Sequence, residues 1–170
     1  MSMTEAHPTS ITDLNRLNDD ARVWVFQSSE VLSGTLRDDI SSALIAFLKD
    51  WAAHGKQLFA AFEIKYDRFI IIGIDEAMAQ ATGCSIDKLM KLIQELDQKH
   101  ELDLLERMKV AYRDGEDIVE CDVNTFTKML AEGRVDKQTV VFNNVVQSIG
   151  ELKTSWETSV QNSWHANLLA

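Results

Sequence analysis

The chain has 170 residues, of which 45% are hydrophobic and 26% are charged, and its formal net charge is −10. This length suits one domain with a hydrophobic core, and the composition excludes the disordered and fibrous classes. The acidic balance argues against binding to nucleic acid or to an anionic membrane surface, because both depend on clustered cations. No apolar run approaches the roughly 20 residues that a membrane-spanning helix needs.

The first 20 residues are polar and contain the only proline, Pro8. They predict a flexible N-terminal arm, residues 1–20, followed by one α+β domain at residues 21–170. The arm has neither the basic leader nor the apolar block of a secretory signal, and Cys84 and Cys121 lack disulfide or metal-site spacing. We therefore expect a cytoplasmic protein with free thiols, no metal and no cofactor.

A strand and a helix are the first regular elements. Residues 22–27 (RVWVFQ) are rich in valine and aromatic residues, which is typical of a strand. Apolar residues then recur at helical spacing from Thr35 onward and include Phe47. The helix is predicted to end at His54 and Gly55, because glycine readily takes the left-handed conformation that follows a helix.

Two strands and a second long helix are predicted next. Residues 58–66 alternate between apolar and polar and indicate a half-buried strand. Residues 69–75 (FIIIGID) are apolar at successive positions, which predicts a central strand covered on both faces. Ser85 is the expected cap of a helix that ends near Lys99 and His100, whose charge suits the negative end of the helix dipole.

The rest of the chain alternates short strands with one short helix. A hairpin is predicted from residues 108–112 to residues 118–121, with Asp114-Gly115 in its turn. A helix at residues 125–132 and a strand at residues 139–142 follow. From residue 143 onward the pattern does not separate helix from irregular structure.

The order of these elements is β-α-β-β-α-β, followed by a strand, a helix and another strand. The first six match the split βαβ, or ferredoxin-like, arrangement, in which an antiparallel sheet carries two helices on one face. The predicted fold class is therefore α+β, with a ferredoxin-like core extended by a C-terminal hairpin, a short helix and a wrapping tail.

The segment GCSID, residues 83–87, places Cys84 beside Ser85 at the start of a helix. The helix dipole lowers the pKa of a thiol in that position and so raises its reactivity. A nucleophile also needs a base, and His54 and His165 are both distant in the sequence. The alternative, which we prefer, is that Cys84 is only a small residue of the helix cap.

Asp75 and Glu76 follow the predicted central strand. With His54 or His165 they offer a mixed oxygen and nitrogen donor set for a metal ion. No short ligand spacing such as HExxH occurs in the chain, so a solvated strand end is the preferred reading.

The C-terminal segment combines aromatic and amide side chains, namely Asn143, Asn144, Trp156, Trp164 and His165. Such groups together line a pocket for a small polar ligand or form a protein interface. The plainer alternative, which we favour, is a tail that wraps the sheet and buries its tryptophans.

Nucleotide-binding motifs are missing from the sequence. The only Gly-Lys pair, Gly55-Lys56, is followed by Gln57, and Asp50 occupies the position where a phosphate-binding loop has its first glycine. No GxGxxG, GxSxG or protein-kinase signature is present.

Several segments nevertheless resemble a family of short, uncharacterised bacterial proteins that are often labelled "ABC transporter ATPase". The matching segments are RVWVFQSS (22–29), WAAHG (51–55), FIIIGIDE (69–76), GCSID (83–87), VFNN (141–144), GELKTSW (150–156) and NSWH (162–165). The resemblance implies no established activity. The label itself is treated as a naming error, because a transporter ATPase needs a phosphate-binding loop and an acidic magnesium motif.

Two functional hypotheses remain. The preferred one is a non-catalytic module of the bacterial cytoplasm that binds a small polar ligand or assembles with protein, with a homodimer as one form of assembly. The alternative is a small enzyme with a Cys/Asp/Glu/His pocket, although no nucleophile and base stand at matched spacing. The candidate pocket residues are Cys84, Ser85, Asp75, Glu76, His54, Asn143, Asn144, Trp156, Trp164 and His165.

Overall fold

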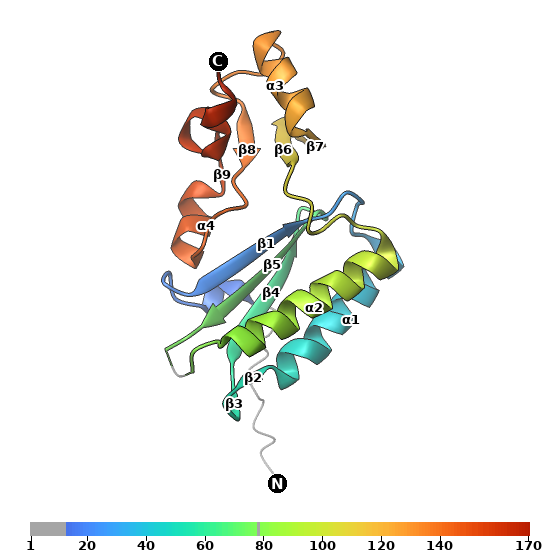
Figure 1. The fold of residues 1–170 in the computed structure, drawn as a ribbon, viewed down its shortest axis with the longest axis vertical. Helices are drawn as coiled ribbons and strands as arrows, with labels where there is room; N and C mark the ends of the chain where they lie inside the picture. The colour runs from blue at the N-terminus through green and yellow to red at the C-terminus, as the bar shows by residue number, and fades with distance from the viewer. Residues whose placement is uncertain (1–12, 78) are drawn as a thin grey trace.

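The computed structural model describes residues 13–77 and 79–170, which form two lobes, each built on its own antiparallel sheet (Figure 1). The first lobe comprises residues 13–100 and the second lobe residues 109–170. Residues 101–108 form the linker between them. Within the described residues, the helices are too short or too polar to span a lipid bilayer.

The first lobe is a three-stranded sheet with two long helices on one face (Figure 1). Its sheet has the order β1-β5-β4, and β5 lies in the centre. The elements are β1 (Arg22–Gln27), α1 (Gly34–Asp50), β2 (Ala52–Ala53), β3 (Lys56–Gln57), β4 (Phe59–Lys65), β5 (Phe69–Asp75) and α2 (Gly83–His100). Every residue of β5 from Phe69 to Ile74 is buried, which confirms the predicted central strand.

Each long helix differs from the prediction at one end, α1 at its C-terminus and α2 at its N-terminus, whereas α2 ends at His100 as predicted. The helix α1 ends at Asp50, and His54 and Gly55, with φ of 50° and 75°, form the turn of the β2–β3 hairpin. Two successive residues with positive φ suit a tight hairpin turn, so this glycine does not end the helix. The helix α2 is capped by Thr82, and Ser85 completes a capping box three residues later.

The start of the described chain is packed against the first sheet. Leu14 lies in a short 3-10 helix, η2 (Leu14–Arg16), and both Leu14 and Leu17 are buried. A Cβ atom at Gly73 would lie 2.7 Å from Leu17 Cδ1, so a larger residue there would force this leucine side chain to shift. The part of the expected flexible arm from residue 13 to residue 20 is therefore structured, and residues 1–12 lie outside the described residues.

The second lobe holds a four-stranded sheet of order β7-β6-β8-β9. Its elements are β6 (Lys109–Asp114), β7 (Asp117–Asp122), α3 (Val123–Ala131), β8 (Val140–Phe142), α4 (Ile149–Ser155), β9 (Glu157–Ser159) and the 3-10 helices η3 (Val160–Asn162) and η4 (Trp164–Leu168). The predicted hairpin, short helix and strand are all present. The hairpin turn is centred on Gly115 and Glu116, one residue later than expected, because Asp114 pairs with Asp117.

The tail from residue 143 onward belongs to the folded body. Trp156 is 2% exposed, and the strand β9 that follows it pairs with β8. Phe69 of β5 packs against the rings of Phe142 and Trp156 at centroid distances of 4.8 and 5.0 Å. The two sheets thus share a core, formed by Leu14, Leu17, Ala21, Val23, Ala61, Phe69, Ile71, Ala111, Phe142, Val146, Ile149 and Trp156.

The α+β class, the antiparallel sheets and the two main helices on one face agree with the sequence prediction, but the ferredoxin-like arrangement is not confirmed. The strand that follows α2, β6, pairs with β7 and β8 and does not join β1. Glu101 and Asp103 in the linker both have φ of 55°, which turns the chain sharply. Leu102 is fully buried and its carbonyl accepts from Ser29 N, so the chain is held at the end of β1 and continues into the second lobe.

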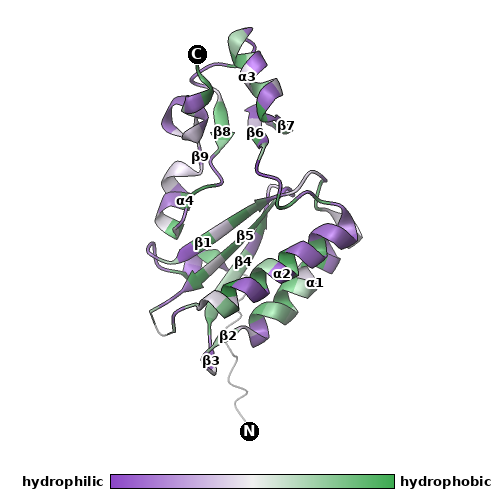
Figure 2. Ribbon diagram, in the orientation of Figure 1, coloured by the Kyte–Doolittle hydropathy of each residue, from purple (hydrophilic) through white to green (hydrophobic). Residues whose placement is uncertain are grey.

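Hydropathy follows this architecture (Figure 2). The strands of the first sheet are largely hydrophobic, while α1 and α2 mix hydrophobic and hydrophilic residues along their length. Leu44 and Trp51 are buried against the sheet as the periodicity predicts, and Phe47 is partly buried against the same core. Burial of one helix face is the ordinary source of helix stability in a globular protein.

Candidate functional site

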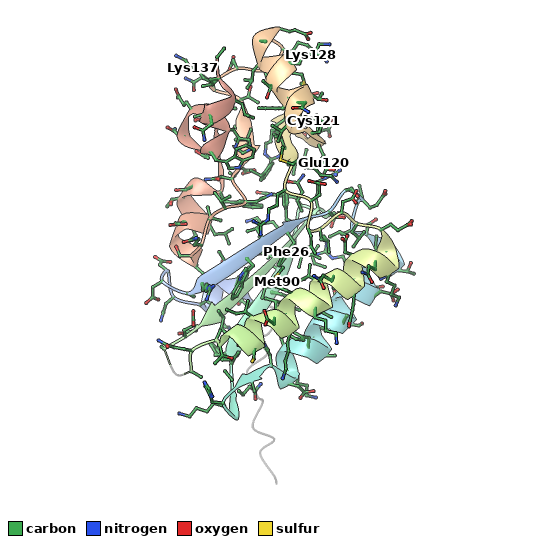
Figure 3. The ribbon with its side chains drawn as sticks, viewed as in Figure 1. Phe26, Met90, Glu120, Cys121, Lys128 and Lys137 are labelled. Atoms are coloured by element: carbon green, nitrogen blue, oxygen red, sulfur yellow. The ribbon has the colours of Figure 1, made fainter. Side chains whose placement is uncertain are left out.

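A cleft of about 1090 Å³ lies between the two lobes, along the outer edge of β1. We call it the interlobe cleft. It is lined by Asp20, by β1 from Arg22 to Gln27, by Leu104 to Lys109, by Asn144 to Gln147, and by Met90, Val123, Phe142 and Trp164. Figure 3 labels Phe26 on β1 and Met90 on α2, which lie on the first-lobe side of this cleft, and Glu120, which lies in the second lobe.

The edge of β1 is paired only at its ends. Backbone groups of successive strand residues point to opposite sides, so even-numbered and odd-numbered residues of β1 face opposite neighbours. Ser28 N donates to Arg68 O on the β5 side, whereas Val23 N donates to Gln147 O on the other side. The even-numbered residues therefore bond to β5. At the other end, Ser29 N donates to Leu102 O. Between these two bonds, the backbone groups of Val25 point into the cleft and have no hydrogen-bond partner among the described residues.

Two apolar side chains stand at the mouth of the interlobe cleft. Met108 in the linker and Val145 before α4 are 60% and 61% exposed, which makes them the most exposed of the large hydrophobic side chains in the described residues. Scattered exposed hydrophobic residues are ordinary, but two that line the same cleft mark a surface suited to an apolar contact.

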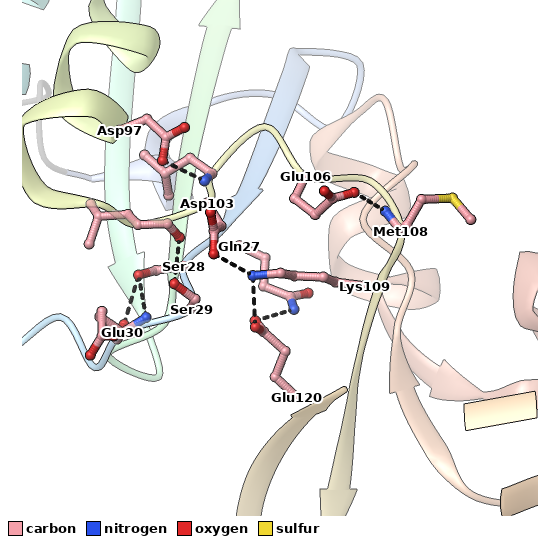
Figure 4. A network of polar contacts seen from close by, with 12 residues as sticks. Gln27, Ser28, Ser29, Glu30, Asp97, Asp103, Glu106, Met108, Lys109 and Glu120 are labelled. Carbon is pink, nitrogen blue, oxygen red and sulfur yellow. Dashed lines mark hydrogen bonds and ion pairs between the residues drawn. The ribbon is translucent and has the colours of Figure 1, made fainter. Parts of the chain in front are cut away.

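A chain of polar contacts crosses from one lobe to the other beside this cleft (Figure 4). Lys109 Nζ lies 3.2 Å from Asp103 Oδ2 and 3.0 Å from Glu120 Oε1. Gln27 Nε2 donates to Glu120 Oε2 at 2.6 Å, and Asn144 Nδ2 donates to Gln27 Oε1 at 3.0 Å. Trp156 Nε1 completes the chain by donating to Asn144 Oδ1 at 2.9 Å. We call these six residues the interlobe network.

The interlobe network holds its charges in a partly dry environment. Burial lowers the pKa of Lys109, but the hydrogen bond and charge of Glu120, together with Asp103, outweigh burial and raise that pKa above its usual value. Lys109 is therefore a charged, paired ammonium at neutral pH. Its side chain orients Glu120, whose other oxygen accepts from Gln27, so the network fixes the position of the second lobe relative to β1.

The sequence-predicted site residues fall into two groups. Cys84, Ser85, Asp75, Glu76 and His54 belong to the first lobe, where they lie at the end of β5, at the start of α2 and in the β2–β3 turn. The tail residues Asn143, Asn144, Trp156, Trp164 and His165 belong to the second lobe. Of these ten residues, only Asn144 and Trp164 line the interlobe cleft.

The polar residues of the first group are occupied with local structure. Asp75 Oδ1 accepts from Ala77 N at 2.9 Å, and Glu76 Oε2 accepts from Ala81 N at 3.0 Å. Ser85 belongs to the helix cap, while Cys84 and His54 are exposed. Within the part of the chain that the structure describes, no group of three or more His, Cys, Asp or Glu side chains is arranged to hold a metal ion.

In the second group, Trp156 and His165 are buried and the other three residues are half-buried. His165 is 1% exposed and stacks on Trp164 with a centroid distance of 3.9 Å. Its Nδ1 lies 2.8 Å from Ser163 Oγ, and burial lowers the pKa of His165 to about 4. This imidazole is neutral at physiological pH. Asn143 donates its backbone N–H to Trp156 O, and its buried Oδ1 has no hydrogen-bond partner in the described residues.

Sequence reasoning missed the residues that build the interlobe cleft and its network, except Asn144, Trp156 and Trp164. Gln27 offered a weak signal, since an amide directly follows the four apolar residues 23–26. Lys109 and Glu120 lie in alternating strands where charged residues ordinarily face solvent, so nothing distinguished them. Their role depends on how the two lobes meet.

The geometry defines an α+β protein of two antiparallel sheets that share a core and enclose a cleft at their junction. No family model, no curated protein and no solved structure matches this chain. Function must therefore be argued from the cleft itself.

Proposed function

We propose that this chain is a non-catalytic binding module whose ligand occupies the interlobe cleft. The observation that carries the proposal is the composition of that cleft, which has apolar side chains at its mouth and a satisfied polar network along one wall. Its volume of about 1090 Å³ suits a ligand of substantial size, since small-molecule sites are commonly about 300–1,000 Å³.

The enzyme alternative has less support. It requires Cys84, Asp75, Glu76 and His54 to surround one pocket together with tail residues such as His165. These residues are divided between the two lobes, and none of the five lines the cleft. A nucleophile without a base within hydrogen-bond reach is not an active constellation.

The split βαβ relationship is retained as part of the proposal. In such a sheet the strand after the second helix pairs with the first strand, and β6 takes another position in this chain. The first lobe then corresponds to the three-stranded part of that sheet, and the cleft lies where a further strand would pair with β1. Cytoplasmic location, a homodimer and kinship with the short bacterial family stay predictions.

The test is a binding screen on the isotope-labelled full chain, followed by nuclear magnetic resonance. Mixtures of small polar molecules and short peptides should contain binders that shift the indole resonances of Trp24 and Trp164. Met108→Glu and Val145→Glu should abolish these shifts. Ile45→Glu, at an exposed position of α1 outside the cleft, is the matched control and should leave them unchanged.

Three outcomes contradict this function. Binders that shift only residues outside the cleft would place the site elsewhere. A binder that is chemically converted, with conversion lost in Cys84→Ser, would favour the enzyme alternative. A screen without any binder would also count against a binding module.

A further inference from the structure

We propose that the interlobe cleft binds a short extended polypeptide segment of a partner protein, which adds as a strand to the edge of β1 and carries a carboxylate for Arg22 or Arg107. This inference rests on the proposed function and deepens it, because it names the class of ligand.

The length of the segment follows from the two ends of the β1 edge. Val23 N is bonded to Gln147 O at 3.1 Å, and Ser29 N is bonded to Leu102 O at 2.8 Å. At about 3.3 Å per residue, the distance along the strand from Val23 to Ser29 is about 20 Å. The chain itself occupies both ends, so the free stretch accepts a strand of about three to five residues.

The free stretch of β1 offers backbone hydrogen-bond donors and acceptors that another polypeptide strand can pair with. Val25 presents an N–H and a C=O to the cleft, and Gln27, two residues further along, presents its own pair on the same side. Val25 is half-buried and Gln27 is 7% exposed, so these groups lie in a partly desolvated place where an unmade hydrogen bond is costly. A second polypeptide supplies donors and acceptors at the matching spacing, as in other cases of strand addition.

Charge selects an acidic segment. Arg22, Arg107 and Lys109 are the basic side chains of the cleft lining, and Asp20 and Glu106 are its acidic side chains. Lys109 is already paired within the network. The exposed Arg22 and Arg107 have no carboxylate within ion-pair distance among the described residues.

The two arginines flank the free stretch. Arg22 begins β1, and Arg107 belongs to the linker that passes the other end of the strand. Met108 and Val145 supply apolar surface in the same cleft. The preferred segment therefore alternates apolar and polar residues and has a carboxylate near one or both ends.

A second copy of this chain fits the edge poorly. Symmetric pairing of two β1 strands needs a free edge along the whole strand, whereas Gln147 and Leu102 bond to its ends and the second lobe stands over it. The occupant is therefore a narrow segment and not another whole sheet.

The probe is a fluorescein-labelled peptide of about six residues that alternates valine and threonine and has glutamate at each end. Binding to the full chain is measured by fluorescence anisotropy. Two N-methylated versions carry methyl groups on alternate amides, so one of them blocks the donors that face β1 and the other blocks those that face away. Only the first should lose affinity, by at least about tenfold, which corresponds to about 1.4 kcal/mol.

Charge is tested with a version that has lysine at each end. It should bind more weakly than the glutamate peptide, and the difference should shrink in high salt. Arg107→Glu should reverse part of the preference. Arg134→Glu, at an exposed arginine outside the cleft lining, is the matched control and should leave it unchanged.

A protein variant tests the edge itself. Proline is tolerated where an edge strand directs its N–H away from the sheet, so Val25→Pro should fold, as circular dichroism will show, and lose peptide binding. Val25→Thr keeps the N–H and should bind like the original chain. If Val25→Pro does not fold, the N-methylated peptides still decide the question with the unaltered protein.

The outcomes separate this inference from the proposed function. Equal affinity of both N-methylated peptides, or binding of small polar molecules in the cleft without any peptide, would overturn strand addition and leave the binding module standing. Peptide binding that shifts no residue of the cleft would overturn both. Tight association of two copies that is lost in Val25→Pro would identify the occupant as a second chain and overturn the inference.

Discussion

The two lobes differ in the size of their hydrophobic cores and in the number of titratable groups with shifted pKa values. In the first lobe, the helices cover one face of the apolar strand β5 and contribute Ile40, Leu44, Leu89 and Ile93 to a continuous core. The other face of β5 belongs to the core shared with the second lobe. The second lobe has a smaller core around Phe126. Several of its titratable groups have pKa values shifted by burial, hydrogen bonds or neighbouring charges. The groups with shifted pKa values, Lys109, Tyr112, Arg113, Cys121, Asp122 and His165, all belong to it.

This difference indicates a division of labour. The first lobe is a hydrophobic scaffold in which the middle of the β1 edge, facing the cleft, has no backbone partner among the described residues. The second lobe contributes charged and amide side chains next to that edge, and it also contains the groups expected to make stability depend on pH. The four predictions below test whether the lobes act as one cooperative unit and whether their chemistry is as different as their composition indicates.

The largest effect is expected from Phe69→Ala. Phe69 is fully buried in the shared core, where it contacts Phe142 and Trp156 of the second lobe. Its truncation should lower the free energy of unfolding by about 3–5 kcal/mol. Urea unfolding followed by tryptophan fluorescence and by circular dichroism measures this change. Phe59→Ala, at a position 40% exposed, is the matched control and should cost far less.

The same experiment tests cooperativity. A shared core predicts coincident transitions by both probes, before and after the substitution. Two separate transitions would show that the lobes unfold independently, and the comparison would then describe two domains.

Acid should act mainly through the second lobe. Burial lowers the pKa of His165 to about 4, below its unfolded value of 6.5. The unfolded chain then binds this proton more readily, so the stability that neutral His165 contributes is present above pH 6.5 and is lost as the pH falls toward 4. The loss is at most about 3 kcal/mol.

Unfolding measured from pH 7 to pH 4 checks this prediction. His165→Phe keeps the ring stacked on Trp164 and removes the titration, so its stability should fall less steeply than that of the original chain. His54→Phe, at an exposed turn, controls for general effects of the substitution. Parallel pH curves for the original chain and His165→Phe would contradict the role of burial.

A smaller effect is expected from Gln27→Ala in the interlobe network. The substitution leaves Glu120 and Asn144 without their bonds to Gln27 and should cost about 1–3 kcal/mol. Gln57→Ala removes an exposed amide bonded to Lys49 O and should change stability by less than about 0.5 kcal/mol. Chemical denaturation measures both.

The coupling can be measured with Asn144→Ala. If Gln27 and Asn144 act in one network, the double variant should be less destabilised than the sum of the single variants. Strict additivity would mean that the two lobes are held only by the shared core.

The last prediction concerns thiol reactivity and leaves stability unchanged. Cys84 of the first lobe is exposed, whereas burial, with smaller contributions from Asp122 and Glu120, raises the pKa of Cys121 from 9.0 to about 11. At pH 8 that shift lowers the thiolate fraction of Cys121 about a hundredfold. Alkylation followed by mass spectrometry should therefore label Cys84 first, and Cys84→Ser should remove the fast phase. Faster labelling of Cys121 would contradict its burial.

Much of the element order could be predicted from local pattern. The strands at residues 22–27 and 69–75 are marked by valine, isoleucine and aromatic residues, and both are present with those bounds. Asp122 caps α3, because its carboxylate is suited to the free N–H groups of a first helical turn. Local chemistry also explains the misplaced end of α1, since a glycine with positive φ serves a hairpin turn and a helix end equally well.

The candidate site could be predicted only in part. Asn144 and Trp164 were singled out as aromatic and amide residues of a tail, and both line the cleft. The sequence carried no sign that Gln27 and Glu120, 93 positions apart, would meet at 2.6 Å. Cys84 was a candidate nucleophile because it lies at the start of a helix. That position is a local feature of the sequence, and it does not indicate whether a catalytic base lies nearby in the fold.

By itself the sequence determined the α+β class, the buried central strand and the helices that cover it, because each depends on periodicity and caps within a few residues. Only the tertiary structure decided that β6 does not pair with the outer edge of β1. This depends on the two linker residues with left-handed backbone conformation and on the hydrogen bond that holds Leu102. The open edge, the cleft and the interlobe network all follow from that one departure. They arise from contacts between distant segments, and such contacts leave no periodic trace in the sequence.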